Sequence, residues 1–117
     1  DSIFNDVTIK DSKAIGIDWS SSQEPFDINF NNSNISMSSF YKLNLKHSNI
    51  IACLAHEVDF SETNLEKVNF KNTDLLNSTF DNTNLQFTDL SMAKNYLINP
   101  ELDYLKKTKV SEDEASS

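Results

Sequence analysis

Apolar side chains recur at every fifth position through the middle of the chain, and this spacing dominates the sequence. The thirteen positions are Phe30, Ile35, Phe40, Leu45, Ile50, Ala55, Phe60, Leu65, Phe70, Leu75, Phe80, Leu85 and Leu90. A small or β-branched residue usually lies two positions before each of them, and Asn or Asp usually lies one position before. A fixed short period of this kind indicates a solenoid.

A period of five fits neither the 3.6-residue repeat of a helix nor the two-residue repeat of a flat strand. It predicts short extended sides joined by corners. Residues two apart in an extended side point the same way, so the small residue and the large apolar residue should both face inward. Asn and Asp suit corners because their side chains hydrogen-bond to nearby backbone.

The number of sides in one coil follows from which residues would stack. With three sides, residues fifteen apart stack, and Phe40 would lie over Ala55. With four sides, residues twenty apart stack, which gives the columns Phe40, Phe60 and Phe80, and Leu45, Leu65 and Leu85. Parallel, in-register stacks favour like residues on like residues, so we predict four sides.

The repeat reads small, Asn or Asp, Leu or Phe, small polar, variable, and good copies are TNLEK, VNFKN, TDLLN, TNLQF and TDLSM. In these copies the chain resembles the pentapeptide-repeat family. The resemblance implies an all-β fold, a right-handed quadrilateral β-helix, here with about four to five coils over residues 1–95. The segment Ala93–Lys109 is similar to the tail of many bacterial members.

An insertion is expected near the N-terminal end. Residues 4–19 repeat with the same spacing in a shifted register, and the step from Trp19 to Phe30 is eleven residues. The segment Ser20–Phe26 should therefore form a bulge or a short projecting loop. Counting across it places Trp19 in the column of Phe40, Phe60 and Phe80, an aromatic ladder that we interpret as core packing.

Residues 96–110 are predicted to form a short C-terminal helical cap over the open end of the solenoid. The residues that support a helix there are Asn99 and Pro100 at its start, Leu102 and Leu105 on its packing face, and Lys106 and Lys107 at its end. Residues 111–117 are polar and are predicted to be disordered.

Composition limits the function classes. The net charge is −8, with ten Lys and no Arg, which disfavours direct binding of nucleic acid. A single Cys excludes an internal disulfide and fits a reducing compartment. The sequence shows no apolar stretch long enough for a membrane span, so we expect a cytoplasmic protein.

Catalytic chemistry is not expected. His47 and His56 are the only histidines, and the motif HEVDF lacks the second His of a zinc protease. Cys53 and His56 have a metal-like spacing but no second pair, and one Gly cannot make a phosphate-binding loop. We predict no enzymatic activity, no metal and no cofactor.

The family resemblance implies a partner. Some relatives resemble DNA in shape and charge and bind type II topoisomerases, so DNA gyrase or topoisomerase IV is the leading candidate. The candidate contact residues are Ser20, Ser21, Ser22, Gln23, Glu24 and Pro25 in the insertion, and the acids Glu57, Glu62, Glu66, Asp74 and Asp81. The acids do not stack on one another in twenty-residue columns, so an acidic surface that only keeps the protein soluble remains an alternative.

A rigid scaffold for an unrelated protein is the alternative function. It would use the outward apolar positions Ile51, Leu76 and Phe87. An enzyme is a third, less favoured alternative. The polar C-terminal segment departs from the apolar stretch through which the topoisomerase-binding relatives dimerise, so we expect a monomer or a weak dimer.

Overall fold

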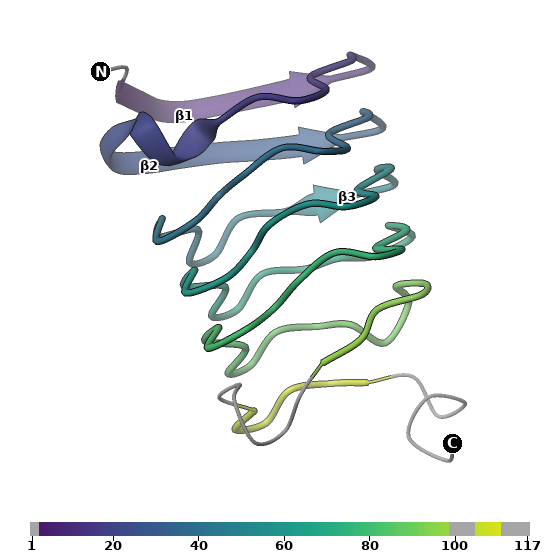
Figure 1. The fold of residues 1–117 in the computed structure, drawn as a ribbon. Helices are drawn as coiled ribbons and strands as arrows, with labels where there is room; N and C mark the ends of the chain where they lie inside the picture. Colours follow the sequence, from purple (N-terminus) through teal and green to yellow (C-terminus); the bar gives the residue numbers. More distant parts are fainter. Residues whose placement is uncertain (1–2, 99–104, 111–117) are drawn as a thin grey trace.

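The computed structural model describes residues 3–98 and 105–110. The chain winds into a stack of coils (Figure 1). Its regular elements are strand β1 (Ile3–Lys10), the 3₁₀ turn η1 (Trp19–Ser21), strand β2 (Gln23–Asn31) and the short strand β3 (Ile50–Ile51). The three strands form one parallel sheet in the order β1-β2-β3. This sheet makes one side of the first coils.

Isolated parallel bridges extend the pairing down the other sides. They join residues twenty apart, as in Asn44 with Asn64 and Asp59 with Thr79. A five-residue repeat with this offset gives four sides to a coil.

We name each side of the coil after one of its inward residues. In chain order the sides are the Phe60 side (17–19, 38–40, 58–60, 78–80), the Leu65 side (43–45, 63–65, 83–85), the Phe70 side (28–30, 48–50, 68–70, 88–90) and the Leu75 side (12–14, 33–35, 53–55, 73–75).

The first coil carries one extra residue. Lys13 bridges Asn34 and Asp18 bridges Ser39, which are twenty-one residues apart. The expected loop over 20–26 contains regular structure: Trp19–Ser21 forms η1, and Gln23–Phe26 belongs to β2. The register of β1 against β2 shifts on both sides of Phe4, so a bulged strand absorbs the insertion.

Stacked rings fill the core behind the Phe60 side. The centroid separations are 6.1 Å from Trp19 to Phe40, 5.3 Å from Phe40 to Phe60 and 5.2 Å from Phe60 to Phe80, and neighbouring rings are within 11° of parallel. Phe70 meets Phe60 edge-on from the opposite side, with ring centroids 5.7 Å apart. Both arrangements are favourable for aromatic rings.

The corners confirm the expected role of Asn and Asp. The backbone N–H of Ser61 donates to Asp59 Oδ1 at 2.9 Å, and that of Glu66 donates to Asn64 Oδ1 at 3.0 Å. Two residues after each large apolar residue the backbone is usually left-handed, with φ of 62° at Lys42 and 59° at Phe87. Residues other than Gly rarely adopt this conformation.

Buried hydroxyl groups tie the coils together. Thr83 Oγ1 donates to the carbonyl of Phe60 and Thr88 Oγ1 donates to that of Leu65, each at 2.7 Å and each across twenty-three residues. These bonds satisfy polar groups inside the core and explain why the small inward residue is so often Ser or Thr.

The described C-terminal residues differ from the predicted helical cap. Residues 96–98 and 105–110 contain no helix. Leu105 and Val110 resume the five-residue period and pack against the core, Lys109 bridges Asp89, and Thr108 Oγ1 donates to the carbonyl of Leu85. A parallel coil satisfies the backbone groups of the preceding coil, which a helix cannot do. The remaining predicted cap residues, Asn99, Pro100 and Leu102, and the segment 111–117 lie outside the described residues.

Candidate partner-binding surfaces

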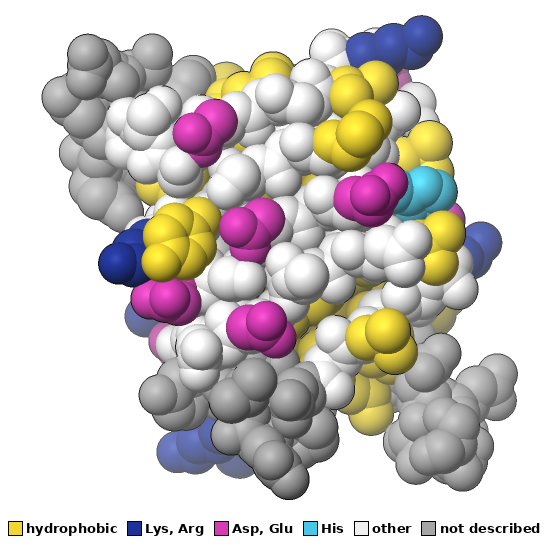
Figure 2. Space-filling view, in the orientation of Figure 1, with side chains coloured by type: hydrophobic (Ala, Val, Ile, Leu, Met, Phe, Trp, Pro, Cys, Tyr) yellow, Lys and Arg dark blue, Asp and Glu magenta, His cyan; other side chains and the backbone are white. Residues whose placement is uncertain are grey.

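Carboxylates gather on the Phe60 side and its two flanking corners. We call this surface the acidic face, and its acids are Asp18, Glu57, Asp59, Glu62 and Asp81. Lys42 is the one lysine on this surface, and the other nine lysines lie on the remaining sides and corners. Figure 2 shows magenta carboxylates spread across the surface that faces the viewer. Charge is therefore segregated around the coil.

An exposed apolar ridge occupies one of the two corners of the acidic face, the corner that also carries Glu57. We call it the apolar corner, and its residues with their exposed fractions are Ile15 (43%), Met37 (60%), Leu76 (41%) and Leu97 (75%). Ile15, Met37 and Leu76 lie at one corner of the coils, where Glu57 lies between Met37 and Asn77, and Leu97 follows the last bridge of the Leu75 side at Lys94. In Figure 2 yellow side chains run along the right-hand margin, beside the cyan histidine. The sequence analysis named only Leu76 of these four, although Ile15 and Met37 follow an inward residue by one and two positions, as Leu76 and Phe87 do.

His56 and Asp74 form a hydrogen-bonded pair beside the apolar corner. His56 Nε2 lies 2.8 Å from Asp74 Oδ2, and Asn95 Nδ2 donates to Asp74 Oδ1 at 2.9 Å. Burial would raise the pKa of the Asp74 carboxyl, but the hydrogen bonds from Asn95 and His56 and the attraction of His56 together hold that pKa below its usual value. Both carboxylate oxygens of Asp74 are thus bound by other side chains of this chain.

The structure divides the predicted acids into two groups. Glu57, Glu62 and Asp81 belong to the acidic face, where η1 also places Ser20 and Ser21. Glu66 lies at another corner, with its carboxylate 3.7 Å from Lys46 Nζ. The sequence missed Asp18 and Asp59, which occupy the Asn or Asp position of the repeat and are outward-facing for that reason.

The remaining candidates are dispersed. Ser22 directly follows η1, and Gln23, Glu24 and Pro25 lie in strand β2 rather than in a loop. Ile51 is half-buried in β3. Phe87 is 38% exposed, but it lies diagonally across the coil from Leu76, because the two corners are half a coil apart.

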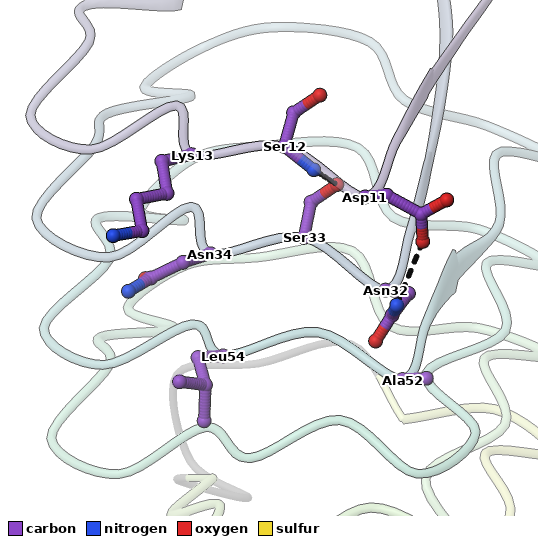
Figure 3. A pocket seen from close by; sticks show the side chains of 8 residues that line it. All are labelled: Asp11, Ser12, Lys13, Asn32, Ser33, Asn34, Ala52 and Leu54. Carbon is purple, nitrogen blue, oxygen red and sulfur yellow. Dashed lines mark hydrogen bonds between the residues drawn. The ribbon is translucent and has the colours of Figure 1, made fainter.

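A shallow groove of about 360 Å³ crosses the Leu75 side of the upper coils. Figure 3 shows its two walls, one formed by Asp11, Asn32 and Ala52 and the other by Lys13, Asn34 and Leu54, with Ser12 and Ser33 between them. Asn32 Nδ2 donates to Asp11 Oδ1 at 2.7 Å, and the Ser12 N–H donates to Ser33 Oγ at 3.1 Å. These contacts brace the coils, and no His or Cys lines the groove.

Other sites for chemistry are sparse in the described part of the chain. No group of three or more His, Cys, Asp or Glu side chains there could hold a metal ion. Burial raises the pKa of the Cys53 thiol, against the smaller effect of backbone hydrogen bonds from Ser33 and Asn32, so the thiol is not activated as a nucleophile. None of the helical turns in this part has the length and apolar character needed to cross a bilayer.

Comparison with known proteins agrees with this architecture. The family described as Pentapeptide repeats (8 copies) matches residues 57–94, whereas no curated protein sequence matches the chain. HetL, a pentapeptide-repeat protein involved in heterocyst differentiation regulation in the cyanobacterium Nostoc sp. strain PCC 7120, is 13% identical with a TM-score of 0.62. That match covers 90% of this chain and 45% of HetL, so the chain spans less than half the length of HetL.

Two further solved structures are similar at a lower level. Rfr23 from the cyanobacterium Cyanothece 51142 is 16% identical, with a TM-score of 0.37 and coverage of 91% of this chain and 88% of Rfr23. QnrB1, a plasmid-mediated fluoroquinolone resistance protein, is 15% identical, with a TM-score of 0.35 and coverage of 93% and 86%. The structural likeness to HetL and the matched repeats support the fold of this chain. The chain is a right-handed β-helix, and its residues 57–94 match the pentapeptide-repeat family model.

Proposed function

We propose that this protein is a non-enzymatic, rigid scaffold whose acidic face docks onto a basic surface of a protein partner. One observation carries the proposal: five carboxylates share the acidic face with a single lysine, while nine lysines lie elsewhere. A surface of one sign attracts and orients a partner of the opposite sign.

The neighbouring apolar corner suits the margin of such an interface. Protein interfaces combine charged groups, which set orientation, with apolar side chains that lose contact with water. Met37 and Leu76 present apolar area directly beside Glu57. The hydrogen-bonded coils hold these groups in fixed positions, so little conformational entropy is lost when the partner binds.

A type II topoisomerase, DNA gyrase or topoisomerase IV, is the most specific partner that this proposal names. The sequence resemblance suggests this class, and such enzymes offer a basic surface that binds DNA. Duplex DNA carries one charge per about 1.7 Å of its axis. The acidic face spans about four coils, roughly 15 Å at one strand spacing per coil, so its charge density is about half that of DNA or less. A bacterial cytoplasmic location belongs to the same proposal.

A gyrase supercoiling assay, with and without a fluoroquinolone, tests the topoisomerase partner. We expect the wild-type protein to inhibit supercoiling or to protect the enzyme from the drug. The triple variant Asp18→Asn, Asp59→Asn, Asp81→Asn should lose the effect, because three charges leave the acidic face while the side-chain oxygens that support its corners remain. Glu66→Gln, an acid at another corner, is the matched control and should act as the wild type does.

The outcomes separate the parts of the proposal. If the wild-type protein has no effect at micromolar concentration, gyrase is not the partner. If the triple variant and Glu66→Gln act equally, the acidic face is not the contact surface. Loss of the effect with added salt is also expected, since exposed charges are screened.

Docking through the apolar corner alone is the second candidate function. It is favoured by the exposure of Met37 and Leu97, at 60% and 75%. Binding of this kind should survive high salt and should be lost in the double variant Met37→Ser, Leu76→Ser. Binding that disappears in salt but persists in this variant would exclude it.

A further inference from the structure

A cationic ridge lies diagonally across the coil from the apolar corner. Lys67, Phe87 and Lys107 occupy the same corner of three successive coils, and we call them the basic corner. Lys67 Nζ lies 5.9 Å from the centroid of the Phe87 ring, and Lys107 Nζ lies 6.0 Å from it on the other side. The ring is therefore held between two ammonium groups, an arrangement stabilised by cation–π attraction.

Phe87 is an unusual residue for its position. It is 38% exposed, and its φ of 59° is left-handed. The matching corner positions of neighbouring repeats carry Asn72, Asn77 and Asn82, a residue type that tolerates this conformation. An aromatic ring that stays partly exposed at a corner is suited to contact with a second molecule.

The acidic face carries a row with complementary charges. Parallel bridges stack Asp18 on Ser39 and Ser39 on Asp59. The two carboxylates are thus two coils apart with a small residue between them, and the two lysines of the basic corner are two coils apart with an aromatic ring between them. One coil corresponds to one strand spacing, about 4.8 Å, so both pairs of charges are separated along the axis by roughly 10 Å.

We infer that the basic corner of one copy of this protein docks onto the Asp18–Ser39–Asp59 row of a second copy. Two β-helices lying side by side share the same axial spacing, so Lys67 and Lys107 face Asp18 and Asp59 while Phe87 lies over Ser39. Each row reads the same in both directions, so the match holds whether the two axes are parallel or antiparallel.

Such a contact uses different surfaces on the two copies. Heterologous contacts that do not close produce growing chains rather than a symmetric dimer. Only four charges at or near the surface and one ring contribute, so the association is weak and sensitive to salt. The contact also covers part of the acidic face, so self-association and binding of the proposed partner compete, although the inference does not require that partner.

Analytical ultracentrifugation of two complementary variants tests the inference. Lys67→Gln, Lys107→Gln removes the basic corner, and Asp18→Asn, Asp59→Asn removes the acidic row while keeping the corner hydrogen bonds to Ser20 and Ser61. Wild-type protein should gain mass with concentration at low salt and return to a monomer at about 0.5 M salt. Each variant alone should stay monomeric.

Mixing the two variants gives the sharpest outcome. Each keeps one intact surface, so the mixture should form a one-to-one complex and nothing larger. The control Lys71→Gln, Lys94→Gln removes two lysines at other places and should associate as the wild type does. The inference is overturned if wild-type protein stays monomeric at low salt, if either variant alone associates as the wild type does, or if the mixture stays monomeric.

The same variants separate this inference from the proposed function. Lys67→Gln, Lys107→Gln should retain any effect on gyrase, because the acidic face is intact. A protein that self-associates but has no effect on gyrase would contradict the named partner and leave the docking of two copies in place.

Discussion

The left-handed corner residue sets the local strain of this fold. Ala52 has a φ of 56° and is exposed, so its methyl group gains no packing that offsets its conformational cost. Ala52→Gly should raise the free energy of unfolding by about 0.5–1 kcal/mol, because glycine adopts this conformation without a steric penalty. Urea unfolding measures the change.

Ala55 provides the matched control. It is fully buried in an extended side, between Ile35 and Leu75 in the same column. Ala55→Gly should lower the free energy of unfolding, since it removes buried area and increases backbone freedom. If both substitutions change stability in the same direction, corner strain does not explain the result.

Asp74 should make stability depend on pH in the acid range. Its folded pKa is lowered from an ordinary value of 3.8: burial acts against the shift, and the contacts with Asn95 and His56 outweigh it. The ionised carboxylate therefore stabilises the fold above pH 3.8, and this contribution is lost as the pH falls through the lowered pKa. Urea unfolding between about pH 2 and pH 6 should show a weaker pH dependence for Asp74→Asn.

Asp89 offers an independent comparison. Burial raises the pKa of its carboxyl. The hydrogen bonds from the hydroxyl and N–H of Ser91 and the charge of Lys109 together lower the pKa by more than burial raises it, so the net shift is downward. Asp89→Asn should likewise weaken the acid dependence. Equal pH profiles for the wild type and both variants would show that these contacts do not persist in solution.

At this scale the sequence predicts the inward residues well and the side-chain contacts poorly. Inward positions follow from the five-residue period, which is local. The contact between His56 and Asp74 depends on how one coil sits above the next, and their eighteen-residue separation carries no local signal. The left-handed backbone at Met37 and Phe87 is equally hidden, because closure of the coil imposes it on any residue type.

The last described coil is the element in which prediction and structure differ most. Lys107 occupies a corner with a φ of 55°, whereas the predicted cap would place it in the last turn of a helix. Lys107→Gly should leave stability unchanged or raise it by up to about 1 kcal/mol at a corner, but should lower it by about 1 kcal/mol in a helix. The free energy of unfolding, measured with urea on dilute protein, distinguishes the corner from the helix.

Lys106 is the control for this comparison. It is exposed in the same turn, and the structure gives no left-handed backbone there that glycine would relieve. Lys106→Gly should therefore not stabilise the protein. A loss of stability in both variants would restore the helical interpretation of this segment.

Element prediction is hardest where local and non-local signals compete. Asn99 and Pro100 are strong local signals for the start of a helix, and they interrupt the period just before Leu105 and Val110 resume it. At the N-terminal end, the eleven-residue step from Trp19 to Phe30 revealed the extra residue. Its placement in a bulged strand could not be predicted, because it depends on pairing with β1.

At the scale of the whole molecule, the distribution of charge matters more than its total. Twenty-residue columns showed that the acids do not lie above one another, and this is correct for Glu57, Glu62 and Asp81. The twenty-residue columns did not show that acids from different columns lie together on the Phe60 side and its two corners. Charge segregation is a property of the closed coil, and it becomes visible only when the sides are placed around an axis.

The acidic face should be separable from the fold. Glu57→Gln, Asp59→Asn and Asp81→Asn together replace outward groups, keep the hydrogen-bonding oxygen at Asp59, and reduce self-repulsion in a chain of net charge −8. We expect the free energy of unfolding to stay within about 0.5 kcal/mol of wild type or to rise, while binding of a basic partner is lost. Urea unfolding and a binding titration on the same samples test both halves. A large loss of stability would mean that these carboxylates hold the solenoid together, and unchanged binding would mean that the partner contacts another side.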